Sequence, residues 1–208
     1  MTGAERPGTA GRTRRAGGRL KHMEPLMLAS ESPRRRELLE AMGVPFEAVG
    51  ADIEETEEGA PEEVVLRNAL GKAEKVLSRF PDRLVLGADT VVVIDGRIFG
   101  KPADQKDAER MLRTLSGRWH EVYTGVALLK KDFRRLEFDR TRVHFVPLTA
   151  GDIDAYIASG EPFGKAGAYA IQGRAGMLID RIEGSSSNVI GLPQALVRRL
   201  LIQAEFNL

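Results

Sequence analysis

The chain has 208 residues, a length that suits one domain or one domain with two lobes. Hydrophobic residues make up 42% and charged residues 29%, which is typical of a globular protein with a buried core. It contains no cysteine, which excludes disulfides, thiolate metal sites and a cysteine nucleophile, and no apolar stretch approaches the ~20 residues that cross a bilayer. We therefore expect a soluble cytoplasmic protein without a membrane partner.

The formal net charge of +1 hides an uneven distribution along the chain. Residues 1–22 carry six basic residues and one acidic residue, which leaves 25 basic and 29 acidic residues in 23–208. This leader has no apolar periodicity and no hydrophobic core of a secretory signal, so we expect a flexible, disordered segment before a single domain at 23–208. A basic arm that binds nucleic acid is the alternative, but the acidic remainder argues against nucleic acid as the main partner.

The first predicted elements are a strand at residues 25–29 and a helix that follows it. Ser32 is a good N-cap, Pro33 fits the first helical position, and Gly43 ends the helix. Three arginines at 34–36 lie in the first turn, where the helix dipole disfavours cations, and a bound phosphate would explain them. The alternative is a solvated basic turn on an ordinary helix.

Strand and helix patterns then alternate along the chain. Further strands are predicted at residues 46–49, 84–88, 91–94, 97–99, 120–130, 138–147 and 177–182, with a hairpin turn at Asp95-Gly96. Further helices are predicted from Pro61, from Asp104 to Gly117, from Thr149 to Ser159 with Asp152 completing a capping box, and from Pro193. These elements predict an α/β fold with a mixed sheet. We interpret loops 52–59 and 160–176 as functional or mobile, and Ser185 to Ser187 as a turn.

Several charged residues stand where a purely structural role is costly. Asp89 follows the apolar run 84–88 and is expected at the C-terminal end of a buried strand, where a carboxylate needs a cation, a hydrogen-bond network or a chemical role. The acidic run 52–58 could supply oxygen ligands to Mg²⁺, or it is a solvated loop. Lys72 and Lys101 each follow a glycine, which permits close approach of a ligand, although most lysines only solubilise a surface. The histidines show no metal-ligand spacing, and no Walker-type phosphate loop is present.

An ordered set of short motifs extends from Leu26 to the end of the chain. They are LASESPRRRELL at 28–39, GADT at 87–90, GKP at 100–102, LSG at 115–117, YTGV at 123–126, GEP at 160–162, KAGAY at 165–169 and NVIGLP at 188–193. Together they resemble the signature of the Maf family, nucleoside triphosphate pyrophosphatases once described as septum-formation inhibitors. The resemblance implies an ITPase-like α/β fold, with a mixed twisted sheet, flanking helices and two lobes around a central cleft, often as a homodimer.

The same resemblance implies roles for individual residues. Asp89 matches the catalytic acid/base position, and Glu55 and Asp89 match the ligands of a divalent cation, Mg²⁺ with Mn²⁺ as the alternative. The residues that match phosphate-binding positions are Ser30, Arg35, Lys72 and Lys101.

The family resemblance also implies the reaction, hydrolysis of a nucleoside triphosphate between the α and β phosphates. Arg34, Thr90 and Gln172 match the branch that acts on dTTP and UTP, and modified pyrimidine nucleotides are further candidate substrates. The 7-methyl-GTP branch, which typically has an aromatic residue in place of that arginine, is one alternative. A non-catalytic regulator of cell division is the other.

Overall fold

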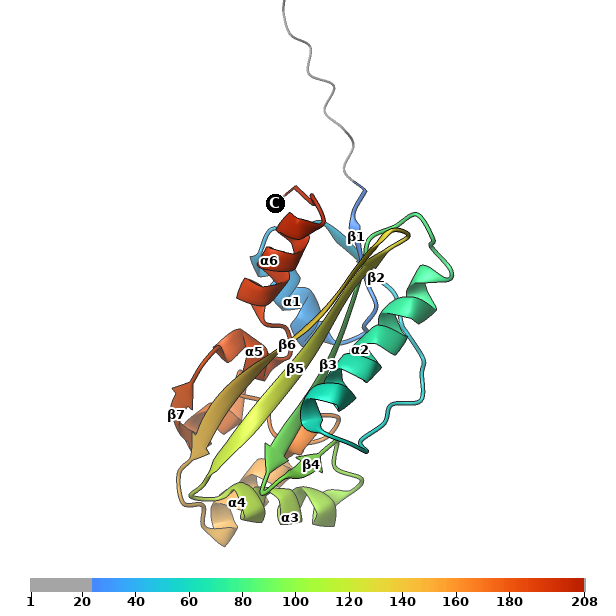
Figure 1. Cartoon of the computed structure of the whole chain (residues 1–208). Coiled ribbons are helices and arrows are strands. Elements are labelled where there is room, and N and C mark those ends of the chain that lie inside the picture. The colour runs from blue at the N-terminus through green and yellow to red at the C-terminus, as the bar shows by residue number, and fades with distance from the viewer. Residues whose placement is uncertain (1–23, 208) are drawn as a thin grey trace, which may run out of the picture.

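The structure is a computed structural model that describes residues 24–207, so the leader predicted at residues 1–22 lies outside the described part. One mixed sheet of seven strands runs through that part (Figure 1). The strands are β1 (Leu26–Leu28), β2 (Phe46–Ala48), β3 (Val85–Ile94), β4 (Arg97–Phe99), β5 (Trp119–Lys130), β6 (Phe133–Phe145) and β7 (Ile179–Glu183). Their order is β2-β1-β3-β5-β6-β7, with β4 paired to β3; β1 is parallel to β2 and β3, and the other pairs are antiparallel. The predicted mixed α/β fold is confirmed.

Helices cover both faces of this sheet. They are α1 (Pro33–Ala41), α2 (Pro61–Leu77), α3 (Gln105–Leu115), α4 (Ala150–Ala158), α5 (Ser186–Ile190) and α6 (Gln194–Gln203), with short 3₁₀ turns η1 (Ala166–Ala168) and η2 (Arg174–Leu178). Side chains alternate between the faces of a strand, so Met27 packs against α2 whereas Leu26 and Leu28 pack against α1 and α6. Figure 1 shows α2 on one side of the long strands and α1 and α6 on the other.

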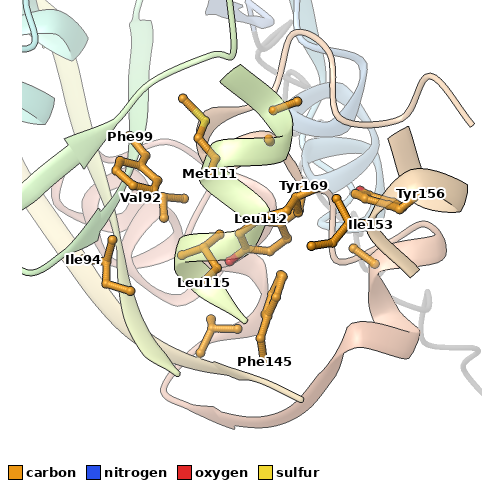
Figure 2. Close-up of a cluster of buried hydrophobic side chains, with 14 of the residues drawn as sticks. Val92, Ile94, Phe99, Met111, Leu112, Leu115, Phe145, Ile153, Tyr156 and Tyr169 are labelled. Atoms are coloured by element: carbon orange, nitrogen blue, oxygen red, sulfur yellow. The ribbon is translucent and has the colours of Figure 1, made fainter. Parts of the chain in front are cut away.

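A second hydrophobic lobe lies at the other end of the long strands, where α3 and α4 pack together (Figure 1). Figure 2 shows Leu112 and Leu115 of α3 near Phe145, Ile153 and Tyr169. Strands β3 and β5 contribute side chains to this cluster and to the cluster around α1 and α6. Two lobes therefore share one sheet, as the resemblance to the Maf family implied.

His120 is a titratable side chain buried at the edge of the second lobe. Its Nε2 lies 2.8 Å from the hydroxyl of Tyr169, and its Nδ1 has no hydrogen-bond partner among the described residues. Burial, with a smaller contribution from nearby His144, lowers the pKa of His120 to about 3. The imidazole is therefore neutral in the folded protein at pH 5–7.

We predict that His120 makes the protein less stable in mild acid. An unfolded histidine takes up a proton below a pKa of about 6.5, while the folded one does not until about 3, so stability falls as the pH drops through this window. The contribution to the free energy of unfolding should be about 2 kcal/mol smaller at pH 5 than at pH 7. Urea unfolding of the wild type and His120→Gln at both pH values measures it, and an equal loss in the two proteins would refute the assignment.

Local signals in the sequence are confirmed at several helix and strand ends. Pro33 occupies the start of α1, the side chain of Asp104 accepts from the amide of Asp107, and Thr149 and Asp152 form the predicted capping box. Asp95 and Gly96 have φ angles of 51° and 70°, as a tight two-residue hairpin turn requires. No helix within residues 24–207 is both long and apolar enough to cross a membrane.

Two local predictions were wrong. Asp89 lies in the middle of the ten-residue β3 and not at the end of a strand, because ladder pairing with β5 continues through Asp89 and Thr90. The serines from Ser185 belong to the cap and first turn of α5, with Ser185 accepting from the amide of Asn188, and do not form a free turn. The predicted N-cap position of Ser32 is confirmed, although its side chain makes no capping bond.

Candidate active site

A cleft of about 1490 Å³ opens on the sheet and is bounded by segments from both lobes. Its walls come from the loop after β1, the acidic loop before α2, the middle of β3, and the glycine-rich segment after α4. Every residue predicted for the site lines this cleft: Ser30, Arg34, Arg35, Glu55, Lys72, Asp89, Thr90, Lys101 and Gln172. The fold thus brings together residues that are far apart in the sequence.

A charged cluster of two carboxylates and two lysines lies on the α2 side of the cleft. Lys72 Nζ lies 2.6 Å from Asp89 Oδ1 and 2.7 Å from Glu55 Oε1, and Lys101 Nζ lies 3.4 Å from Glu55 Oε2. The side chains of Lys72 and Asp89 are each 8% exposed, whereas Lys101 is 62% exposed. Burial raises the pKa of Glu55, but the hydrogen bonds and charges of Lys72 and Lys101 outweigh burial and hold this pKa below its usual value. Glu55 is therefore anionic at neutral pH.

Asn68 joins this cluster and was not predicted from the sequence. It is buried on α2, and its Nδ2 donates to Asp89 Oδ2 at 2.9 Å. Asn68 and Lys72 are four residues apart, so they lie on the same face of α2. A polar pair at this spacing within an apolar helical stripe was the signal that could have identified Asn68.

Arg35 lies on the opposite side of β3 and makes three hydrogen bonds to neutral groups. Its Nε donates to Gly191 O at 2.8 Å, and its two terminal nitrogens donate to Ser30 Oγ at 3.1 Å and Thr90 Oγ1 at 3.2 Å. Burial lowers the pKa of Arg35, an effect that the nearby Asp89 carboxylate partly offsets. Arg35 has no ion pair among the described residues, so a half-buried cation is held ready for an anion.

Strand alternation explains why neighbouring residues serve the two sides of the cleft. Asp89 points toward Lys72, whereas Thr90 points toward Arg35 on the other face of β3. Thr124 Oγ1 donates to Asn188 O at 3.0 Å, so the Thr90 hydroxyl donates to Thr124 Oγ1, 3.0 Å away. Thr90 thus supports Arg35, and its role in base selection stays a prediction. Thr124 and Asn188 were missed, although both fall within the short motifs.

Arg34 and Gln172 lie toward the second lobe. Arg34 is partly buried, which lowers its pKa, while Glu37 and Tyr156 oppose this effect. Gln172 is exposed to the cleft on the glycine-rich segment. In the described part of the chain, neither side chain takes part in the ion pair between Asp89 and Lys72.

Glu161 and Tyr156 hold the ends of the loop that carries Gln172. Glu161 Oε2 accepts from the amide of Arg174 at 2.9 Å, the hydroxyl of Tyr156 donates to Glu161 Oε1 at 2.8 Å, and the amide of Ala170 donates to that hydroxyl at 3.2 Å. Burial raises the pKa of Glu161, but the hydrogen bonds from Arg174 and Tyr156 outweigh it and lower the pKa. The carboxylate is therefore charged and fixes the loop.

The oxygen atoms of the cleft fit a hard divalent cation. Within residues 24–207, no group of three or more His, Cys, Asp or Glu side chains is placed to hold a metal ion. The carboxylates of Glu55 and Asp89 nevertheless lie close enough to share one positive charge, because both contact the ammonium group of Lys72. Mg²⁺ usually takes one or two carboxylates and completes its shell with phosphates and waters. This pair of carboxylates therefore suits such an ion if ligands from outside the chain complete its shell.

The chain is similar to known proteins over most of its length. The model of the family described as Maf-like protein matches residues 25–204. A Bacillus cereus protein named dTTP/UTP pyrophosphatase is 49% identical over 183 residues, which cover 86% of this chain and 90% of that protein. A Gloeobacter violaceus protein of the same name is 51% identical over 184 residues, covering 88% and 96%. The solved Ham1 protein of Staphylococcus aureus is similar at 14% identity with a TM-score of 0.47, over 85% of this chain and 99% of that one. The chain belongs to the Maf-like protein family.

Proposed function

We propose that this protein is a nucleoside triphosphate pyrophosphatase that acts on dTTP and UTP and releases the nucleoside monophosphate and pyrophosphate. Relatives that share 49% and 51% of their residues with it carry the name dTTP/UTP pyrophosphatase. The observation that carries the proposal is the cleft itself, in which the buried Asp89 is fixed by Lys72 and Asn68. Arg35, which has no ion pair among the described residues, lines the same cleft.

The reaction is displacement at the α phosphorus. Asp89 orients a water molecule and accepts its proton, the water oxygen bonds to phosphorus, and the bond to the oxygen that bridges the α and β phosphates breaks. Pyrophosphate leaves with that electron pair. Arg35, Lys72 and Lys101 neutralise the phosphate charges, which otherwise repel the water and oppose departure of the leaving group.

Glu55 and Asp89 would hold a divalent cation, Mg²⁺ with Mn²⁺ as the alternative, that neutralises phosphate oxygens when bound. Lys72 can keep a carboxylate contact and add a phosphate contact when the nucleotide binds, because its ammonium group has three hydrogen-bond donors. A homodimer is the remaining part of the proposal, and light scattering on the full chain would measure its mass.

We predict that Gln172 reads the pyrimidine edge. Gln172→Leu leaves polar atoms of the base unpaired, at a cost of about 1–3 kcal/mol. This corresponds to a roughly 5- to 150-fold fall in kcat/KM for dTTP and UTP, with a smaller fall for 7-methyl-GTP. Gln105→Leu, an exposed glutamine at the start of α3 outside the cleft, is the matched control. An equal fall for all three nucleotides would show that Gln172 does not select the base.

A further inference from the structure

We infer that Asn68 is a positioning residue that fixes the acidic loop and Asp89 relative to one another, an inference that rests on the proposed hydrolysis at this site. The acidic loop, residues 51–60, contains no helix or strand. Asn68 bonds to both backbone groups of one residue in it: its Oδ1 accepts from Thr56 N at 3.0 Å, and its Nδ2 donates to Thr56 O at 2.9 Å. This pair of bonds gives the loop the anchorage that a neighbouring strand would otherwise supply.

The third bond of Asn68 reaches the proposed catalytic carboxylate. Both hydrogens of its amide nitrogen are used, one by Thr56 O and one by Asp89 Oδ2. This set of partners fixes the orientation of the amide, because a flipped side chain would direct its oxygen at a carbonyl and a carboxylate. Lys72 donates to the other oxygen, Oδ1, so both oxygens of Asp89 are held by α2.

The same contact fixes Glu55, which precedes Thr56 in the chain. With Thr56 held, Glu55 Oε1 lies 2.7 Å from Lys72 Nζ, and Glu55 Oε2 lies 3.4 Å from Lys101 Nζ. The loop packs on α2 at a second point, because a side-chain carbon added at Gly71 would lie 3.1 Å from Cδ1 of Ile53. A loop that is already ordered loses less conformational entropy when nucleotide and cation bind.

The helix can hold these contacts because it lies directly on the sheet. A side-chain carbon added at Gly87 would overlap the carbonyl of Ala69, and one added at Gly125 would overlap the carbonyl of Val65. Glycine on β3 and β5 therefore lets α2 approach until Asn68 reaches Asp89. Asn68 is 4% exposed, and its bond to Asp89 is buried and therefore shielded from competing water, whereas its two bonds to Thr56 are partly buried.

Three variants separate positioning from simple packing. Asn68→Leu keeps the volume but removes all three hydrogen bonds. Asn68→Asp keeps an acceptor for the amide of Thr56, loses both donors and places a second carboxylate against Asp89. Val76→Ala is the matched control, because Val76 is buried on the same helix but does not line the cleft.

The readouts are hydrogen exchange at the amide of Thr56, Mn²⁺ binding by calorimetry, and kcat and KM for dTTP. In Asn68→Leu, protection of the Thr56 amide should be lost, and Mn²⁺ affinity and kcat/KM should each fall about 10- to 100-fold, as for other residues that orient ligands. Asn68→Asp should retain more protection at Thr56 yet have a lower kcat than Asn68→Leu. Val76→Ala should lower the melting temperature and leave Thr56 exchange and kcat/KM within about twofold of the wild type.

Wild-type protection of Thr56 in Asn68→Leu, or a kcat/KM within twofold of the wild type, would overturn the inference. A wild-type protein that turned over no nucleotide would instead refute the proposed function. In that case the exchange and Mn²⁺ measurements would still decide whether Asn68 fixes the loop.

Discussion

Asp89→Asn should lower kcat for dTTP and UTP by about 10²-fold or more, because an amide cannot accept the proton of the attacking water. The substitution keeps the size of the side chain, so the protein should stay folded. Asn68 and Lys72 each donate a hydrogen bond to one oxygen of the Asp89 carboxylate. The variant side chain at position 89 has a single oxygen, so it can accept from only one of these donors while its NH₂ group faces the other.

Steady-state kinetics and a melting curve on the same sample measure this effect. Asp154→Asn, an exposed aspartate on α4, is the matched control and should retain wild-type turnover. A folded Asp89→Asn protein with near wild-type kcat would remove Asp89 from the catalytic role.

Lys72→Met should affect both stability and turnover strongly. Methionine has a similar shape but no charge, so Asp89 and Glu55 would face each other without the cation that lies 2.6 Å and 2.7 Å from them. Removing one partner of a buried ion pair typically costs about 3–5 kcal/mol of unfolding free energy. Loss of this charge from the phosphate site should also lower kcat by about 10²–10³-fold.

A double variant distinguishes these two consequences. Adding Asp89→Asn to Lys72→Met removes the uncompensated buried charge, so it should recover much of the lost stability without recovering turnover. Urea unfolding of the wild type, the two single variants and the double variant gives the coupling free energy. Strictly additive losses of stability would show that Lys72 and Asp89 are not coupled as the structure places them.

Apolar periodicity and capping residues were sufficient to predict the mixed sheet, because they carry that information locally, whereas the two lobes and most residues of the cleft were expected from the resemblance to the Maf family. The error at Asp89 has a physical cause. A polar pair after an apolar run is typical of a strand end, but here both side chains find partners on the helices that cover the sheet. Asp89 pairs with Lys72 of α2, and Thr90 accepts from Arg35 of α1. Tertiary contacts therefore let the strand continue.

The missed residues depend on contacts between distant segments. Asn68 meets Thr56 and Asp89 only when α2 lies on β3. Thr124 meets Thr90 only through the β3–β5 pairing, and it meets Asn188 only where α5 packs on β5. Such contacts between distant segments cannot be predicted from a local sequence pattern. A polar residue within an apolar helical face is the one signal that could have directed attention to Asn68.

The most direct test of the account is hydrolysis of dTTP, UTP and 7-methyl-GTP by the pure full-length protein with Mg²⁺ in ¹⁸O-labelled water. We predict that dTTP and UTP are the preferred substrates, that the products are the monophosphate and pyrophosphate, and that the label appears in the monophosphate because water attacks the α phosphorus. Release of a diphosphate and inorganic phosphate, label in pyrophosphate, a preference for 7-methyl-GTP, or no turnover would each contradict the account.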